Sequence, residues 1–569
     1  MSANKTLKLS DRLFFVGNVD KMNTDPSPLH ELISHVLSSE EPKLQISKSL
    51  LPLGTMQQLN QRLMHQPLLN FINATLRGIG QVIFVNNPVS GLLFLIAMFI
   101  QAPWLGTMSL LGTAIATLTA IILQKHFAKI FQINRDNIQN GIFGLNGLLT
   151  GATIASLGLF GNGRWNLNWA IAVIVFASLS TVLMETVGVW FASQFRVAPL
   201  GIPFHIALLS FVILVLFLPQ TYFDFGSLPP VSPSQLNGLR LAQSLPLSIG
   251  QVFFSNSWVV GILIVLGIAI CTPISAIVGL LGCVMYLLAG LLLQVTPNDL
   301  YTGLWGYNAV LTAIAIGGVF YTPNLFSISI ALGCAFLASL VSWGLAALFA
   351  PLKLPVLALP FVIVTIGCFL ILRRSLPSLV PVALHTVASP EEHRQRFLVA
   401  KRIISNFRRQ LAAALQSKPR QLLFKQASST FKGDLRYIFD AIDQDQSGHL
   451  CIEELTNHLN QAGKGLSDNE ITLLFTSMDS DRSNTIDFEE FGELMLRHRQ
   501  LMAEYNDFLT YFLPLDADED NIISLDEMNI AMASVGELPL TKDEVAFLRD
   551  RTGGQLLTWN QFIEVLLVT

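Results

Sequence analysis

The sequence predicts an all-α protein. A polytopic membrane region of two inverted repeats, with about ten spanning helices plus re-entrant pore helices, precedes a soluble α-helical region. First, 51% of the 569 residues are hydrophobic and only 13% are charged, whereas soluble proteins carry about 25% charged residues. Second, 29 of the 39 acidic residues lie after residue 390. Third, the apolar part of the chain contains one set of landmarks twice, in the same order.

The composition divides the chain into five segments. The polar N-terminal part lacks the apolar core and small-residue cleavage site of a signal peptide, so we expect nothing to be removed there. The expected segments are a cytoplasmic N-terminal segment at 1–65, the two repeats at 66–230 and 231–390, a basic amphipathic linker at 391–430 and a soluble helical domain at 431–569.

Three landmarks carry the duplication. GQVIFVNNPVSGLLFL at 80–95 recurs as GQVFFSNSWVVGILIV at 250–265, and GIFGLNGLLT at 141–150 recurs as GLWGYNAVLT at 303–312. Each half then closes on a Pro-Phe pair, which ends at Phe204 or Phe361. Three matched landmarks in one order indicate an internal duplication.

Each half contains five apolar runs, one of them interrupted by glycine. A span needs roughly 20 apolar residues, so several of these runs are short for a straight crossing. The runs are 89–104, 106–124, 141–160, 167–192 and 204–219 in the first half, and 259–275, 277–294, 303–320, 325–350 and 360–373 in the second. Because an odd number of spans reverses direction, the halves are predicted to be inverted, with a solute site between them near the midplane.

Two glutamines, Gln81 and Gln251, interrupt the apolar pattern at equivalent positions. Their segments are short and end in polar residues, which is typical of re-entrant helices. Non-helical backbone at membrane depth is tolerated where it lines a cavity. We therefore expect the two side chains to face each other from opposite sides of one pathway. The alternative is a pair of packing or helix-capping amides.

The Gln-Val-x-Phe pair, the Asn-Asn-Pro at 86–88, the Gly-x-x-Gly-x-Asn elements and the Pro-Phe closers together resemble the urea transporter family, over about residues 66–375. The resemblance implies passive, channel-like transport by a homotrimer with one pore per protomer. It also implies a ladder of hydrogen-bond acceptors between walls that compress a flat solute. By position, Gln81 and Gln251 are the ladder amides, and the walls are Phe84, Leu145, Leu149, Val252, Tyr307 and Leu311.

The chemistry of urea agrees with this interpretation. Urea is small, planar, neutral and rich in N–H donors, and the carbonyl of an amide side chain accepts hydrogen bonds. A carboxylate would also accept, but it would cost desolvation and attract cations. The repeats show no ring of acids or bases, and the chain shows no nucleophile–base pair or phosphate-binding loop. These patterns argue against an ion channel and an enzyme, and nothing indicates a nucleic-acid partner.

Three residues leave the choice of solute open, and a fourth, Glu185, has more than one possible role. The family has threonine two residues before each Pro-Phe, where this chain has Gly201 and Ala358. His205 favours ammonia or another small amide, or else is a packed helix histidine. Glu185 lies inside a spanning run, where carboxylates are often functional, or else it serves a helix end or a protomer contact.

A basic stretch follows the last span. Residues 394–425 carry nine Lys or Arg and no acidic residue, an excess typical of the cytoplasmic side. We expect both termini in the cytoplasm, with the protein in a plasma or inner membrane. An apolar stripe at helical spacing predicts an amphipathic helix that binds a lipid surface or a calcium-sensor groove. The stripe is Phe397, Ala400, Ile404, Phe407, Leu411 and Leu415.

Three loops in the acidic region have the oxygen pattern of calcium sites. Each alternates oxygen donors and ends in a glutamate at position 12, which suits a seven-oxygen shell. They look like EF-hands, so calcium is the implied cofactor. The ligands are Asp443, Asp445, Ser447, His449 and Glu454; Asp479, Asp481, Ser483, Thr485, Asp487 and Glu490; and Asp516, Asp518, Asp520, Ile522, Ser524 and Glu527. A fourth loop at 550–561 lacks these acids and is expected to be a pairing partner only; the alternative is four metal-free turns.

The charges of this acidic domain and of the linker are opposite. Residues 431–569 contain 27 acidic and nine basic residues, and sensor EF-hands expose an apolar groove when calcium binds. We therefore expect the domain to dock on 394–425 and to regulate a urea channel. The alternatives are a calcium buffer, a linker on anionic lipid, a channel for ammonia or another amide, and a non-conducting calcium-responsive scaffold.

Overall fold

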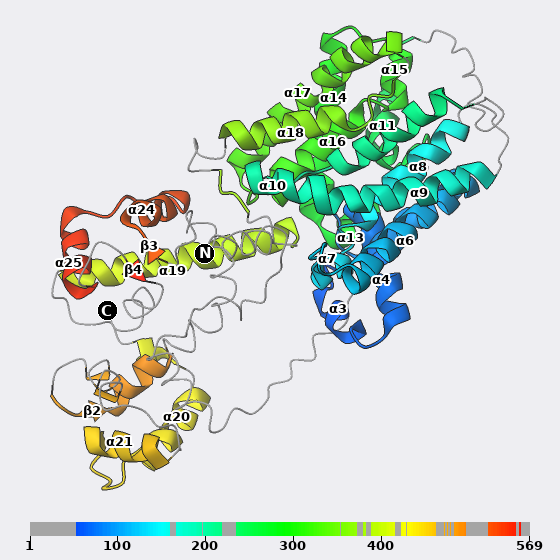
Figure 1. Ribbon diagram of the computed structural model, residues 1–569. Helices are drawn as coiled ribbons and strands as arrows, with labels where there is room; N and C mark the ends of the chain where they lie inside the picture. The colour runs from blue at the N-terminus through cyan, green and yellow to red at the C-terminus, as the bar shows by residue number, and fades with distance from the viewer. Residues whose placement is uncertain are drawn as a thin grey trace, which may run out of the picture. The chain divides into compact units, whose positions relative to one another are not determined.

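The computed structural model describes residues 53–558, apart from 160–166, 196, 219–234, 353, 373–378, 383–387, 416–422, 428, 462–470, 473–474, 476–477, 480–482, 497–521 and 553–556. Most of the predicted N-terminal segment therefore lies outside the described residues. The described chain divides into two units after Gln395. Both units are mainly helical, as predicted (Figure 1).

The first half of the membrane unit is a run of helices separated by short turns. Its elements are α3 (Gln57–Leu63), α4 (Pro67–Gln81), α5 (Pro88–Gln101), α6 (Pro103–His126), α7 (Arg135–Gln139), α8 (Gly144–Leu159), α9 (Leu167–Leu183), the π-turn η2 (Met184–Gly188), α10 (Val189–Phe195) and α11 (Ile202–Leu216).

The second half repeats the order of the main helices, without a counterpart of α3 and with its π-turn after α16. Its elements are α12 (Gly238–Gly250), η3 (Gln251–Phe253), α13 (Trp258–Cys271), α14 (Pro273–Leu292), α15 (Pro297–Thr302), α16 (Gly306–Ile314), η4 (Ala315–Val319), α17 (Leu325–Phe349), η5 (Ala350–Leu352) and α18 (Leu359–Leu372). The packing also repeats. Helix α6 lies on α8 and α9 as α14 lies on α16 and α17, and α4 lies on α5 as α12 lies on α13.

Glycine permits the close packing of α4 on α5 and of α12 on α13. A Cβ added at Gly91 would lie 1.9 Å from the carbonyl oxygen of Leu76, and one added at Gly261 would lie 2.0 Å from that of Pro246. No side chain fits at such a distance. The two glycines occupy equivalent places in the 80–95 and 250–265 landmarks, which explains why both landmarks contain one there.

Helices α5 and α13 join the halves and run antiparallel. At one end, the Gln101 side chain that closes α5 accepts a hydrogen bond from the Asn256 amide, before α13, at 3.1 Å. At the other end, the Ile270 carbonyl of α13 and the Asn87 side chain that caps α5 both bond to the backbone of Gly54, at 3.1 and 2.7 Å. The end of each helix therefore lies beside the start of the other.

Fewer described helices are long enough to span a membrane than the ten apolar runs of the sequence suggested. Four described helices are long and apolar enough to cross a membrane: α6, the continuous α9–α10 run, α14 and α17. The pair α12 and α13, bent by 73°, is a fifth candidate. Helices α5, α11 and α18, and the α16–η4 run, are apolar but shorter. Several of the ten predicted spans are thus short helices, which need tilt or a protein-lined environment to cross.

Helix α19 (Pro390–Leu415) begins in the first unit and ends in the second. The second unit then contains η6 (Leu423–Gln426), α20 (Ser429–Ile442), β1 (His449–Leu450), α21 (Ile452–Gln461), β2 (Ile486–Asp487), β3 (Ile522–Ile523), α24 (Leu525–Ser534), α25 (Lys542–Thr552) and β4 (Leu557–Thr558). The strands pair antiparallel, with His449 opposite Asp487 and Ile523 opposite Leu557. The first calcium loop thus pairs with the second, and the third pairs with the degenerate fourth.

Candidate functional site

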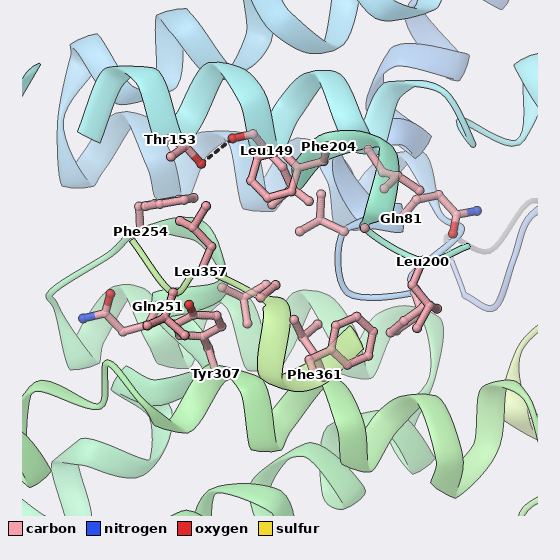
Figure 2. A pocket seen from close by; sticks show the side chains of 18 of the residues that line it. Gln81, Leu149, Thr153, Leu200, Phe204, Gln251, Phe254, Tyr307, Leu357 and Phe361 are labelled. Carbon is pink, nitrogen blue, oxygen red and sulfur yellow. Dashed lines mark hydrogen bonds between the residues drawn. The ribbon is translucent and has the colours of Figure 1, made fainter. Parts of the chain in front are cut away.

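A cavity of about 540 Å³ lies between the two halves of the membrane unit. All eight residues assigned to the pore by position lie on its wall: Gln81, Phe84, Leu145, Leu149, Gln251, Val252, Tyr307 and Leu311. The walls are mostly apolar, and the first and second halves both contribute to them (Figure 2).

The two glutamines lie at opposite ends of the row of side chains labelled in Figure 2. Aromatic and aliphatic side chains, among them Tyr307 and Phe361, lie between them. We expected the two side chains to face each other from opposite sides of one pathway, and this stays a prediction. The pathway has one glutamine near each end and an apolar middle.

Each glutamine makes the same contact in its own half. The Gln81 Nε2 donates to the Asn140 carbonyl at 2.9 Å, and the Gln251 Nε2 donates to the Thr302 carbonyl at 2.9 Å. The Gln251 nitrogen also donates to the Asn256 side chain at 2.8 Å. Among the described residues, none donates to either glutamine Oε1. The nitrogens are thus committed to the protein, and the oxygens remain acceptors on the cavity wall.

The backbone around each glutamine explains its placement. The chain turns sharply after Gln81 and Gln251, so that Phe84 and Phe254 both adopt left-handed conformations, with φ of 61° and 58°. Non-glycine residues rarely take positive φ, and such strain concentrates at functional sites. Leu200 and Leu357, which precede the two Pro-Phe closers, share φ of 49°. These four residues also line the cavity.

The wall of the cavity contains a cluster of aromatic rings. Phe84 meets Phe320 edge-on with ring centroids 5.7 Å apart, and Phe361 at 6.0 Å. Position-matching within the repeat could have found Phe254, because it aligns with Phe84. No sequence signal identified Phe320, which follows the end of η4 and has no matched landmark. Phe361 was recognised as a landmark but not as a wall.

The residues whose roles the sequence left undecided lie in different environments. Gly201 and Ala358 both line the cavity. The hydroxyls that threonine would supply at these positions are therefore absent from the cavity wall. His205 is buried outside that lining, with its Nδ1 2.6 Å from the Gly201 carbonyl oxygen. Glu185 lies in the π-turn η2, and Met184 beside it lines the cavity.

Sequence reasoning missed Arg77, which is fully buried in α4. Its guanidinium donates to the Thr55 and Met56 carbonyls at 2.7 and 2.8 Å, to the Asn86 carbonyl and side-chain oxygen at 2.8 and 2.9 Å, and to the Asn73 side chain at 3.2 Å. A buried charge needs such partners, and every one of these acceptors is neutral. Arg77 therefore fastens residues 55–56, before the repeats, to the turn after Gln81.

The first predicted calcium loop is arranged for a cation. Carboxylate oxygens of Asp443, Asp445 and Glu454 all lie within 4.8 Å of one another. Gly448 has φ +81°, as the sharp turn at position 6 requires. Hydrogen bonds from Ser447 lower the pKa of the exposed Asp445 carboxyl. The His449 backbone carbonyl, expected at position 7, accepts from the Ser447 hydroxyl at 2.8 Å. The oxygen ligands of this loop fit the coordination shell of calcium.

The second loop is described in part. The Asp479 carboxylate accepts from the Ser483 and Asn484 amides at 2.9 Å each, and Asn484 takes φ +59° in place of glycine. The Ser483 hydroxyl donates to the Thr485 carbonyl at 2.9 Å. The Asp487 carboxylate accepts from the Glu490 amide at 2.7 Å. Asp481 lies outside the described residues.

The third loop is described only at its end. Asp516, Asp518 and Asp520 lie outside the described residues, whereas Ile522 belongs to β3. The Ser524 hydroxyl accepts from the Glu527 amide at 3.2 Å, and the Glu527 carboxylate accepts from the Ser524 amide at 2.9 Å. This capping box begins α24 and holds the position-12 glutamate toward the loop.

The predicted apolar stripe of α19 is mostly buried. Ala400, Ile404, Phe407 and Leu411 are buried, and Leu415 is exposed. Polar contacts join this helix to the segment between α24 and α25 and to the first turn of α25. The Ser405 hydroxyl donates to Glu537 at 2.7 Å, and Arg408 pairs with Glu544 at 3.7 Å and donates to the Leu538 carbonyl.

A second part of the linker lies on the second calcium loop. The Phe424 ring packs 5.3 Å from Phe488, and the Phe424 amide donates to Glu493 at 2.7 Å. A Cβ added at Gly492 would lie 2.4 Å from this ring. Phe424 thus occupies a space that only glycine leaves open.

Comparisons with known proteins agree with both sites. Residues 72–373 match the model of the urea transporter family, and residues 432–496 match that of the EF-hand domain pair. Urea transporter 1 of Mus musculus is 31% identical over 356 residues, which cover 61% of this chain and 89% of that protein. Urea transporter 1 of Ovis aries is 30% identical over 352 residues, 61% and 88% of the two chains. Calcium-dependent protein kinase 11 of Oryza sativa subsp. japonica is 30% identical over 132 residues, 23% of each chain.

The family model covers more than half of this chain, and its apolar helices are those of an integral membrane protein. The repeated glutamines and nearly all of the cavity lining lie within the residues that this family model matches. The chain therefore belongs to the urea transporter family.

Proposed function

We propose that the cavity between the halves conducts urea passively across the membrane. The observation that carries the proposal is the shared arrangement of Gln81 and Gln251. Because each amide nitrogen is held by a backbone carbonyl, each Oε1 is fixed as an acceptor on the cavity wall. Urea has four N–H donors and enters as a neutral molecule, so fixed acceptors replace part of its hydration.

The apolar middle of the cavity supports selection by shape. A flat solute fits between aromatic and aliphatic walls, whereas a hydrated ion would lose its water there without compensation. Phe84, Phe320 and Phe361 supply such walls, as do Leu145, Leu149 and Leu311. The proposal needs no catalytic residue. It includes a homotrimer with one pore in each protomer, as the resemblance to the family implies, and cytoplasmic termini, as the basic excess at 394–425 indicates.

We propose that calcium binds the EF-hand loops that begin at Asp443, Asp479 and Asp516. The clustered oxygens of Asp443, Asp445 and Glu454 support this most directly. We propose further that the domain docks on the linker and regulates the pore. The ion pair of Arg408 with Glu544 and the packing of Phe424 on Phe488 support docking, because the first joins opposite charges and the second joins apolar surface.

A second candidate solute is ammonia or another small amide. The observation that favours it is the loss of both threonine hydroxyls from the wall, at Gly201 and Ala358. A smaller set of acceptors discriminates less strongly in favour of a donor-rich solute. The third candidate, a calcium-responsive scaffold that conducts nothing, predicts no solute flux at all.

One experiment separates these candidates. The purified chain is placed in liposomes, and influx of urea, ammonia and acetamide is followed by stopped-flow light scattering or an internal pH dye. Urea flux well above that of empty liposomes supports the first proposal, and ammonia or acetamide flux without urea supports the second. The comparison is repeated with and without calcium, for the intact chain and for one ending after residue 395. A calcium effect confined to the intact chain would support regulation.

A further inference from the structure

The first turn of α19 is attached to the membrane unit at two separate places. The Glu391 carboxylate accepts from the Ile274 amide at 2.8 Å and the Thr272 hydroxyl at 3.1 Å, at the start of α14. The Glu392 carboxylate accepts from the Thr55 hydroxyl at 2.8 Å. It also caps its own helix by accepting from the Ser389 amide at 2.7 Å. Two neighbouring glutamates thus fix the start of the helix that leads to the calcium domain.

The Thr55 contact continues to a pore glutamine. The Thr55 carbonyl accepts from Arg77, and Arg77 donates to the Asn86 side chain. The Asn86 Nδ2 donates to the Asn140 side chain at 3.1 Å, and the Asn140 carbonyl accepts from Gln81. Thr55, Arg77, Asn86, Asn140 and Gln81 are all buried. Buried hydrogen bonds are strong and cooperative, so displacement of one member shifts its neighbours.

The second half has no equivalent route. Leu247 stands at the position that corresponds to Arg77. Gln251 is held by Asn256 and Thr302, and the Asn256 amide bonds to Gln101 of α5. In the described part of the chain, no chain of side-chain hydrogen bonds leads from these residues to Glu391 or Glu392. Among the described residues, side-chain hydrogen bonds therefore connect Gln81, and not Gln251, to α19.

We propose that the first turn of α19 positions Gln81 through Thr55 and Arg77, and that the calcium domain acts on the pore at this glutamine and not at Gln251. The inference rests on the proposed urea pore and calcium domain, and it names the place where regulation reaches the solute. Thr55 and Arg77 are positioning residues, since neither lines the cavity. Calcium-dependent movement of α19 changes the position of the Gln81 Oε1 in the cavity.

The chain offers matched variants for a test. Thr55→Val removes the hydroxyl that reaches Glu392 but keeps the backbone carbonyl that binds Arg77. Thr55→Ser keeps the hydroxyl. Thr272→Val removes the corresponding hydroxyl partner of Glu391, at the contact that does not lead to Gln81. Each variant is made in the intact chain, reconstituted in nanodiscs for hydrogen exchange and in liposomes for urea flux.

Hydrogen exchange reads the position of the pore turn without requiring flux. In Thr55→Val we expect amides of residues 80–87 to exchange about fivefold faster, the factor that one ordinary hydrogen bond represents, with those of 250–257 unchanged. Urea flux falls by a similar factor, and Thr55→Ser restores both. Thr272→Val leaves 80–87 as in the wild type. In the wild type, calcium changes exchange at 80–87, and in Thr55→Val it does not.

The outcomes separate the parts of the inference. Unchanged exchange at 80–87 in Thr55→Val overturns it, and so does an equal effect of Thr272→Val, which would indicate general loosening of α19. If calcium leaves wild-type exchange unchanged, regulation at Gln81 is refuted, while the variants still decide whether α19 positions this residue. Absence of urea flux in the wild type refutes the proposed pore alone, because the exchange measurement stands without it.

Discussion

Gln81 and Gln251 make the same hydrogen bond in the two halves of the protein. Each donates its amide nitrogen, at 2.9 Å, to the carbonyl of the residue before a left-handed glycine. These glycines, Gly141 and Gly303, have φ of +75° and +62°. In each half, the residue before the second landmark of the repeat thus supplies the backbone carbonyl that binds the glutamine of the first landmark. The two landmarks form one structural element in each half.

Replacing either glutamine by leucine should reduce urea flux by about tenfold or more, because an acceptor is lost from the wall and a backbone carbonyl loses its donor. Stopped-flow influx in liposomes measures the change, and size-exclusion chromatography verifies assembly. Gln124→Leu is the matched control, since the Gln124 Nε2 also donates to a backbone carbonyl, that of Ile133, but outside the cavity. Normal flux in both pore variants would exclude these residues from the pathway.

Gly91→Ala and Gly261→Ala should each prevent close packing of a helix pair, because the new Cβ would overlap a backbone carbonyl. We expect a large loss of folded protein and a lower melting temperature by scanning fluorimetry. Gly333→Ala is the control. It lies in α17 with no atom within 4 Å of the added Cβ, so alanine should stabilise its helix by up to about 1 kcal/mol. Equal stability of all three variants would contradict the packing argument.

Calorimetry on the intact chain should detect about three calcium ions, one for each loop with a glutamate at position 12. Changing Glu454, Glu490 and Glu527 together to glutamine should abolish this binding, since each supplies the bidentate carboxylate. Glu453→Gln is the control, because Glu453 is exposed beside Glu454 and has no assigned ligand role. Calcium binding that survives the triple change would refute the assigned ligands.

Gly492→Ala should displace Phe424 from the second calcium loop, because the added methyl would lie inside the ring's contact distance. The freed linker should be cut faster by trypsin after Lys425, as followed by mass spectrometry. Gly433→Ala serves as the control, since nothing lies within 4 Å of its added Cβ. If the two variants are cut equally fast, the Phe424 contact does not hold the linker.

The sequence predicted the features that repeat. The two glutamines, the glycine-rich elements and the Pro-Phe closers occur twice, and their positions in the cavity follow from that symmetry. Family membership and the all-α class are confirmed. The features that occur once were not predicted. Arg77 has no matched residue in the second half, and its acceptors at Thr55, Met56 and Asn86 become neighbours only when the chain folds back.

The same limit applies to the helices. Apolar runs indicate what lies in lipid, but they do not tell a straight crossing from a short helix that another helix shields. Helices α5 and α13 are 14 residues each, and each lies against the other. Hydropathy reports that the two helices are apolar, but it does not report that they pack against each other. Among the described helices, the ten runs therefore correspond to four or five of full spanning length.

The antiparallel seam of α5 and α13 bears on how such a chain arose. A polypeptide with only one half would leave the seam face of its α5 without a partner, and Phe94, which packs on Phe253 across the seam at 4.9 Å, would stand uncovered. Such an ancestor could bury that face by associating with another molecule inserted the opposite way round. Fusion of the two genes would have fixed that pair in one reading frame. It would also have freed the two mouths of the pore to diverge, and only one of them now holds Arg77 and the threonine that reaches α19.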